Sequence, residues 1–311
     1  MAGNRSLGAA RNAKKDEFYT RLEDIAYELR HYDEHFAGKV VYCNCDDPRI
    51  SNFYQYFKLN FHELDLKRLI TTCYQNQSPD LFSQHDVEQA VGVDYDGATE
   101  RVFRLEDDGD FRSTESIALL EQSDIVVTNP PFSLFREYIA QLVEHDKKFL
   151  VIGSKNAITY KETFSLIQAG KLWLGYGFRA GNAYFKTPYP DEYARGVYDP
   201  ETKLVKFRNV GWFTNMDHAK RHEKLMLYDA YTPEAYPMYD NYDAIEVSRI
   251  ANIPKDYDGV MGVPITFLDK YNPSQFEVLG IANSARWIGY ECYTVIGGKK
   301  IYNRILIRRR K

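Results

Sequence analysis

The segment Asn129-Pro130-Pro131-Phe132 combines residue types that suit methylation of an aromatic amine. The amino nitrogen of adenine is a poor nucleophile because its lone pair is delocalised into the ring. The Asn129 side-chain oxygen and the Pro130 carbonyl can each accept one N–H, which aims the lone pair at an electrophilic methyl group. Pro130 and Pro131 fix φ and stiffen this loop. Phe132 offers a flat face to a base flipped out of the duplex.

The position of this motif supports the catalytic interpretation over a Pro-Pro turn without chemistry, which has the same letters. Residues 124–129 read as a buried strand. A helix is expected after it, with Ser133 as N-cap and Phe135, Ile139 and Leu142 facing inward. The motif would then lie at the carboxyl end of a strand, where sheets with parallel strands bind ligands.

Strands and helices alternate through much of the chain, which predicts an α/β fold with a mostly parallel sheet and helices on both faces. The first helix is expected over 20–36, with Thr20 and Glu23 as a capping box. A helix carrying Phe53, Tyr56 and Phe57 follows the first strand, and another covers 161–169. Strands are expected at 39–44, 68–74, 91–96, 101–105, 124–129, 149–153, 172–174, 204–207, 211–214, 224–228 and 278–281.

The composition is that of a globular protein, with 311 residues of which 44% are hydrophobic and 27% charged. No apolar run reaches the roughly twenty residues of a membrane span, and residues 1–15 lack a signal-peptide centre, so we expect a soluble, cytoplasmic protein. Four cysteines without a C-x-x-C pair predict reduced thiols and no zinc site. The net charge of −4 argues weakly against nucleic acid. Residues 299–311, basic and without acids, are either a solvated tail or a phosphate contact.

Five segments, in order along the chain, carry a resemblance to a known family. They are residues 16–20 (Asp-Glu-Phe-Tyr-Thr), 40–48, 109–111 (Gly-Asp-Phe), 129–132 and 262–268. With them the sequence resembles the EcoRI-type family of adenine-specific DNA methyltransferases. The resemblance implies a Rossmann-like fold dependent on S-adenosylmethionine, with a smaller, irregular C-terminal target-recognition region.

The resemblance also implies which residues bind the cofactor. One group would hold its methionine end: Phe18, Tyr19 and Thr20. The loop after the first strand matches the main cofactor motif: Asn44, Cys45, Asp46 and Asp47. Asp110 would hydrogen-bond the cofactor's adenine, and Phe111 would pack against it. The wider superfamily has a Gly-rich turn where this chain has Cys45-Asp46-Asp47-Pro48, and no acidic residue for the ribose stands at the end of the second strand.

The main hypothesis is therefore a site-specific DNA adenine-N6 methyltransferase that acts on double-stranded DNA as a monomer, with a cognate restriction endonuclease as a candidate partner. Residues 1–228 would form the methyltransferase domain, with 177–209 as a candidate DNA-contacting insertion, and 229–311 the target-recognition region. A second hypothesis changes the acceptor to cytosine N4, an RNA base or a protein glutamine. A third is a catalytically inactive, DNA-binding relative.

Two other patterns are discounted as sites. His218 and His222 have the i, i+4 spacing that can hold a metal on a helix, but no third ligand is apparent, so no metal is expected. The glycines between Gly175 and Gly181 have the wrong spacing for a phosphate-binding loop.

Overall fold

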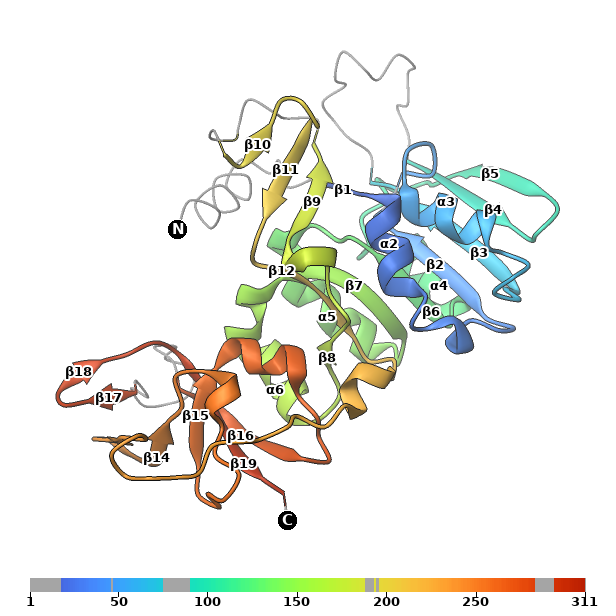
Figure 1. Cartoon of the computed structure of the whole chain (residues 1–311). Helices are drawn as coiled ribbons and strands as arrows, with labels where there is room; N and C mark the ends of the chain where they lie inside the picture. The colour runs from blue at the N-terminus through green and yellow to red at the C-terminus, as the bar shows by residue number, and fades with distance from the viewer. Residues whose placement is uncertain are drawn as a thin grey trace. The chain divides into compact units, whose positions relative to one another are not determined.

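A computed structural model describes residues 18–45, 47–74, 90–187, 193, 196–282 and 294–310 (Figure 1). The chain forms two compact units. Unit 1 consists of Met1–Lys155 and Gly175–Met216, and unit 2 of Asn156–Leu174 and Asp217–Lys311. The division does not follow the predicted boundary at residue 228.

Unit 1 is built on a mixed sheet in which the strands β5-β4-β3-β2-β6-β7-β12 are neighbours in that order. The four strands from β3 to β7 are parallel, whereas β4, β5 and β12 run antiparallel to their neighbours. The predicted strands of this region are confirmed: β2 (Val40–Asn44), β3 (Arg68–Thr72), β4 (Val91–Tyr95), β5 (Glu100–Arg104), β6 (Ile125–Thr128), β7 (Lys148–Ser154) and β12 (Val210–Thr214).

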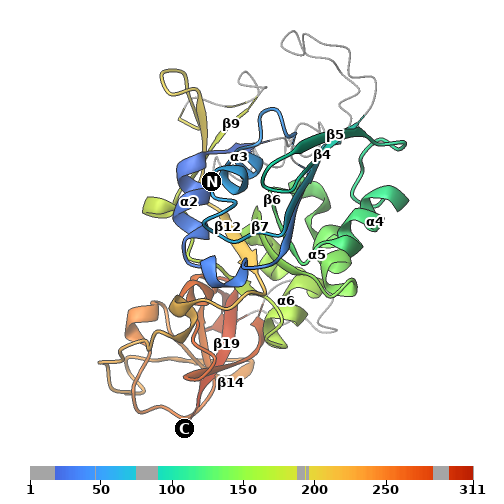
Figure 2. The same cartoon turned by 90° about the vertical axis from the view of Figure 1, so that its right-hand side faces the viewer.

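Helices cover both faces of this sheet (Figures 1 and 2). α2 (Leu22–Leu29) and α3 (Asn52–Leu59) lie on one face, and α4 (Thr114–Gln122) and α5 (Phe135–Glu144) on the other. The Ser51 hydroxyl caps α3 by accepting from two backbone N–H groups.

Two predicted helix starts are wrong. Thr20 belongs to a strand and does not cap α2, whose N-cap is Arg21 without a side-chain hydrogen bond. The helix also ends at Leu29, before a separate 3-10 turn, η1 (Asp33–His35). Ser133 is no N-cap either, because the Pro-Pro turn continues as a 3-10 helix, η2 (Phe132–Leu134), before α5 begins.

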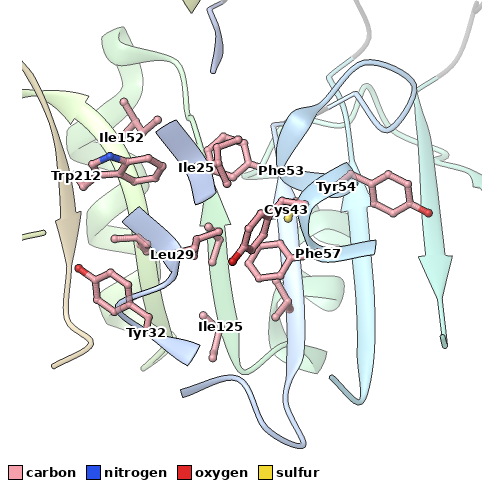
Figure 3. Close-up of a cluster of buried hydrophobic side chains, with 14 of the residues drawn as sticks. Ile25, Leu29, Tyr32, Cys43, Phe53, Tyr54, Phe57, Ile125, Ile152 and Trp212 are labelled. Atoms are coloured by element: carbon pink, nitrogen blue, oxygen red, sulfur yellow. The ribbon is translucent and has the colours of Figure 1, made fainter. Parts of the chain in front are cut away.

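The core of unit 1 lies between α2, α3 and the sheet (Figure 3). Ile25 and Leu29 of α2 and Phe53 and Phe57 of α3 are buried there, as the helical spacing predicts. Burying each such side chain contributes roughly 2 kcal/mol. On the sheet side the cluster includes Cys43, Ile125, Ile152 and Trp212.

A small antiparallel sheet in unit 1 has the strand order β1-β9-β11-β10. Its strands are β1 (Tyr19–Thr20), β9 (Ala183–Lys186), β10 (Tyr198–Asp199) and β11 (Leu204–Phe207). Phe185, Val205 and Phe207 are buried in the core that contains Phe18. The predicted insertion over 177–209 thus pairs with the segment that the resemblance assigns to the cofactor.

A buried carboxylate anchors the chain where it enters this sheet. Glu28 on α2 is fully buried and accepts hydrogen bonds from the backbone N–H groups of Tyr176 and Gly177, each at 2.7 Å. The Tyr32 hydroxyl donates to the same carboxylate at 2.9 Å. These bonds, followed by the short η4 (Arg179–Gly181), fix the segment that leads into β9.

Unit 2 contains a second mixed sheet with the order β13-β14-β15-β19-β16, and a separate hairpin of β17 and β18. The 3-10 helices are η3 (Lys155–Thr159), which begins at the boundary, η6 (Ala219–His222), η7 (Ile250–Asn252) and η8 (Ile265–Lys270). The other elements are α6 (Lys161–Gln168), β8 (Trp173–Leu174), β13 (Met238–Tyr239), β14 (Tyr242–Glu246), β15 (Met261–Pro264), β16 (Phe276–Ala282), β17 (Val295–Ile296), β18 (Lys299–Lys300) and β19 (Arg304–Arg309).

Side-chain contacts explain two differences from the predictions in unit 2. α6 belongs here because it packs against β16, where Gln168 donates to the Leu279 carbonyl at 2.7 Å. The strand predicted at 224–228 is absent, since the Gln275 side chain bonds both the N–H and the carbonyl of Leu225 in place of a neighbouring strand. No helix among the described residues is long and apolar enough to cross a membrane.

Candidate active site

The Asn129 side chain follows β6 and is held in one orientation. Its Nδ2 donates to the carbonyl oxygen of Phe18 at 2.6 Å, a contact between residues 111 positions apart. Its Oδ1 is buried and has no hydrogen-bond partner among the described residues. Leaving such an acceptor unpaired costs about 1–3 kcal/mol. Asn129 Oδ1 is therefore placed to accept an N–H from a bound molecule.

The two prolines after Asn129 form a tight turn. Pro130 is buried, and the Pro131 carbonyl accepts from the backbone N–H of Leu134 at 3.0 Å, which closes η2. Neither proline has a backbone N–H, so at these two positions the main chain offers only acceptors. Pro130 directly follows Asn129 in the sequence. The two predicted acceptors, the Asn129 side-chain oxygen and the Pro130 carbonyl, therefore come from consecutive residues.

Phe132 is half-buried and packs against Phe18, with ring centroids 5.6 Å apart and planes tilted by 33°. The Phe18 ring also packs against Phe207 and Phe185, with ring centroids 5.0 Å and 5.7 Å apart. Phe18 thus orients Asn129 through its carbonyl and Phe132 through its ring. The sequence prediction assigned Phe18 to the cofactor alone and missed this contact with the motif of residues 129–132.

Asn44, at the end of β2, takes part in a buried network. Its side-chain Oδ1 accepts from the Tyr138 hydroxyl of α5, and its carbonyl accepts from the Thr128 hydroxyl at the end of β6. All three residues are buried. The Asn44 carbonyl therefore ties the end of β2 to the end of β6, and the Asn44 side chain ties the end of β2 to α5. Neither Tyr138 nor Thr128 was predicted, although a tyrosine on the apolar face of α5 was a signal for a buried polar contact.

The loop after β2 turns without a glycine. Cys45 adopts a φ of 73°, the left-handed conformation that glycine favours, at a cost of roughly 1–2 kcal/mol. Cys45 therefore supplies the sharp turn of this loop. Asp47 accepts from the backbone N–H of Arg49 at 2.9 Å and pairs with its guanidinium, which raises the pKa of Arg49. Asp46 lies outside the described residues.

Gly109 brings its loop against the end of β3. A Cβ there would lie 2.2 Å from the Cys73 carbonyl oxygen, and φ is +78°, so only glycine fits. The next residue, Asp110, accepts from Arg112 Nη2 at 2.7 Å and Nε at 2.9 Å. These side-chain bonds lower the pKa of Asp110, which is therefore ionised at neutral pH.

Phe111 is buried beside this carboxylate. Its ring meets Tyr138 edge to face at 5.0 Å, and its carbonyl accepts from the Gln141 side chain at 3.0 Å. Asp110 and Phe111 thus combine a charged acceptor with an apolar surface at the end of β3. That combination suits the edge and the face of a purine.

Thr20 in β1 is a second buried residue with an unpaired oxygen. The residue is 3% exposed, and its Oγ1 has no hydrogen-bond partner among the described residues. Its carbonyl accepts from Asn52 Nδ2 at 2.6 Å, which fixes β1 to α3. Tyr19, the preceding residue, is half-buried.

The described part of the predicted site therefore gathers at one edge of the unit 1 sheet. The Asn44–Thr128 bond joins the ends of β2 and β6, and Gly109 packs on the end of β3. The contact between Asn129 and Phe18 adds β1. Open α/β sheets bind their ligands at this edge.

The histidine pair in unit 2 does not form a metal site. His218 is buried and its Nε2 bonds the Leu174 carbonyl at 3.0 Å, whereas His222 is exposed and pairs with Asp217 at 2.7 Å. Burial lowers the pKa of His218 to about 4. Across the described ranges, no group of three or more His, Cys, Asp or Glu residues is placed to hold a metal ion.

Comparison with known proteins identifies relatives along almost the whole chain. The family model described as adenine-specific methyltransferase EcoRI matches residues 6–310. Type II methyltransferase M.EcoRI of Escherichia coli is 46% identical over 327 residues, covering 100% of this chain and 98% of the relative.

Two mycoplasma proteins are also similar to the chain. Type II methyltransferase M.MgeORF184P of Mycoplasma genitalium is 39% identical over 281 residues, covering 87% of this chain and 84% of the relative. Type II methyltransferase M.MpnI of Mycoplasma pneumoniae is 39% identical over 277 residues, covering 87% and 83%. No solved structure matches the chain.

Proposed function

The chain belongs to the EcoRI family of adenine-specific methyltransferases, and we propose that it methylates the exocyclic N6 amine of a flipped-out adenine at a specific site in double-stranded DNA. One observation carries the proposal at the level of atoms. Asn129 Oδ1 is a buried acceptor without a partner among the described residues, beside the Pro130 carbonyl at the end of β6. An adenine amine has two N–H donors that match this pair.

Each residue of the motif has a defined task in this reaction. Asn129 Oδ1 and the Pro130 carbonyl accept the two N–H bonds and favour a pyramidal nitrogen whose lone pair points at the methyl donor. Phe18 keeps the Asn129 amide from rotating, because its carbonyl already takes the Nδ2 donor. Phe132 offers a ring face to the flipped base. The proton leaves the product amine to water after transfer, so no general base is required beforehand.

The residues of this edge fit S-adenosylmethionine, which supplies an electrophilic methyl group on its sulfonium. Thr20 Oγ1, buried and unpaired among the described residues, suits the amino acid end, with Phe18 and Tyr19 beside it in sequence. The ionised Asp110 and the ring of Phe111 suit the adenine end. We place the loop from Asn44 to Asp47 along the cofactor, with Asn44 shaping the loop through its bond to Tyr138.

We further propose a division of labour between parts of the chain. Unit 1, whose sheet has four parallel strands and helices on both faces, would be the Rossmann-like methyltransferase domain and would hold the site. The C-terminal region from residue 229, within unit 2, would recognise the DNA sequence. The enzyme would act as a monomer and would be paired with a restriction endonuclease, a role supported by the type II methyltransferases among its relatives.

The test is an Asn129→Ala variant assayed by transfer of a labelled methyl group to DNA. We expect the rate to fall by roughly 10²-fold or more, as for loss of a transition-state hydrogen bond. Calorimetry should give wild-type affinity for S-adenosylmethionine, since Asn129 contacts the acceptor. Asn60→Ala, which removes an amide that bonds the Tyr56 carbonyl in α3, should retain the wild-type rate.

The methylated product distinguishes the alternatives. N6-methyladenine in hydrolysed DNA would support the proposal, whereas N4-methylcytosine or methylated protein would change the acceptor. A wild-type protein that binds DNA but not S-adenosylmethionine would be an inactive relative. A wild-type rate for Asn129→Ala would overturn the site. Long-read sequencing of DNA from expressing cells would give the recognition sequence.

A further inference from the structure

The hairpin of β17 and β18 in unit 2 has a turn built for tight, twisted strands. Val295 pairs with Lys300 and Ile296 with Lys299 in antiparallel register. Gly297 and Gly298 connect them with φ values of +56° and +74°. Positive φ at both central positions is the signature of a type I′ turn, whose twist matches that of the flanking strands.

This hairpin is anchored to β13 and β14 by the turn between them. The Asp240 carboxylate accepts from the backbone N–H groups of Gly297 at 3.2 Å and Gly298 at 2.7 Å. The Asp240 N–H donates to the Val295 carbonyl at 2.8 Å, and the Asn241 side chain accepts from the Val295 N–H at 3.3 Å. The hairpin is therefore held in place before any partner binds, which lowers the entropic cost of binding.

The hairpin and the strand after it form the most basic part of the chain. Glu291 is the last acidic residue in the sequence. Lys299 and Lys300 are exposed at the tip, while Arg304 is buried in an ion pair with Glu246. Residues 294–310 thus contain no Asp or Glu, and the carboxylate of Asp240 is bonded to the hairpin at its two glycines.

An exposed aromatic residue follows the tip. Tyr302 is 81% exposed, an unusual state for so large a side chain. Its position is fixed, because its carbonyl accepts from the Thr294 hydroxyl at 2.9 Å and its ring lies 5.9 Å from the Arg304 guanidinium. Asn303 beside it is also exposed.

We propose that this basic hairpin, residues 294–303, enters the major groove of the substrate DNA. A two-stranded ribbon fits the roughly 12 Å width of that groove. Lys299 and Lys300 would contact phosphates, and Tyr302 and Asn303 would face base edges, where an Asn amide can pair with adenine. This inference rests on the proposed function and names the element of the C-terminal region that binds DNA.

Binding of a fluorescent duplex at several salt concentrations tests the phosphate contacts. In the full-length Lys299→Ala/Lys300→Ala variant, we expect weaker binding to duplexes with and without the methylated site. The logarithm of the binding constant falls linearly as the logarithm of the salt concentration rises. The steepness of this line should decrease by about 2 in the variant, because each lysine releases about one counterion when it neutralises a phosphate. Lys224→Ala/Lys270→Ala is the matched control, since both lysines are exposed in unit 2 and each follows an acidic residue. Its slope should equal that of the wild type.

A second variant tests base recognition. Asn303→Ala should weaken binding to the specific duplex by roughly 10-fold and leave binding to the unrelated duplex unchanged. These side chains are exposed, so thermal unfolding and S-adenosylmethionine affinity should match the wild type.

The outcomes separate this inference from the proposed function. The wild-type enzyme could methylate DNA while the lysine variant keeps the wild-type salt dependence. That result would show that the hairpin is solvated, and it would overturn this inference but not the proposed function. A wild-type protein that neither binds nor methylates DNA would overturn both.

Discussion

At the scale of single residues, two buried oxygens without partners among the described residues belong to the candidate site. Folded proteins pair nearly all of their buried polar atoms. Asn129 Oδ1 and Thr20 Oγ1 are unpaired among the described residues. The two residues are linked through Phe18, because Asn129 donates to the carbonyl of Phe18 and Thr20 lies two residues after Phe18. We interpret one as the acceptor for the substrate amine and the other as a cofactor contact.

A Thr20→Val variant separates stability from ligand binding. Removing an unpaired buried hydroxyl should raise the free energy of unfolding of the ligand-free protein by about 1 kcal/mol. The same change should weaken S-adenosylmethionine binding roughly 10-fold, the equivalent of one hydrogen bond. Thr163→Val in α6 is the control, because Thr163 Oγ1 is also buried and unpaired among the described residues but lies in unit 2. It should stabilise the protein without changing the affinity. Unchanged affinity in Thr20→Val would rule out the contact.

His218 gives stability a pH dependence. Burial lowers its pKa from 6.5 to about 4, so between these values the unfolded chain binds a proton that the folded chain does not. The stabilisation is complete above pH 6.5 and is lost as the pH falls toward 4, by up to roughly 3 kcal/mol. Urea unfolding between about pH 7 and 5 should show this slope, and His218→Gln should flatten it. An equal slope in both proteins would refute the assignment.

At the scale of elements, bonds between strand ends position the site. The Thr71 hydroxyl donates to the Cys43 carbonyl at 3.0 Å, and the Thr128 hydroxyl donates to the Asn44 carbonyl. These bonds align the carboxyl ends of β3, β2 and β6. The loop at Gly109 then packs directly on the end of β3, so its path depends on the absence of a side chain there.

Gly109→Ala should disrupt this packing. The added Cβ would lie 2.2 Å from the Cys73 carbonyl oxygen, so one of the two segments must move. We expect a loss of about 3 kcal/mol in the free energy of unfolding and much weaker S-adenosylmethionine binding. Gly38→Ala has a similar φ of +71° with nothing within 4 Å, and it should cost only about 1 kcal/mol. Equal effects of the two substitutions in thermal unfolding would show that backbone strain alone is responsible.

At the scale of the whole molecule, the second unit is discontinuous in sequence. Asn156–Leu174 packs with Asp217–Lys311, and α6 contacts β16 through the bond from Gln168 to Leu279. A fragment of residues 229–311 would lack α6 and expose the surface that it covers. We expect this fragment not to unfold cooperatively, whereas the full chain should. A sharp thermal transition of the fragment, followed by circular dichroism, would contradict the importance of α6.

The sequence by itself determined the family and most of the strands, and it located the Asn-Pro-Pro-Phe motif to which we assign catalysis. Hydrophobic runs and the strand-to-helix alternation are local signals, so they located β6 and the loop after it without a structure. The five matching segments carried the assignment to the EcoRI family, which the family model and the relatives confirm. Helix starts were less accurate, because Thr20 and Ser133 have the residue types of N-caps but serve a strand and a 3-10 turn.

Only the tertiary structure decided how the site is held. The partners of Asn129 and Asn44 are Phe18 and Tyr138, 111 and 94 residues away, and no periodic pattern encodes such pairs. The unit boundary likewise depends on where α6 finds a surface to cover, which its own amphipathic pattern does not specify. Local patterns report which face of a segment will be buried. Long-range packing selects the partner that buries it, and so decides which polar atoms remain unpaired for a ligand.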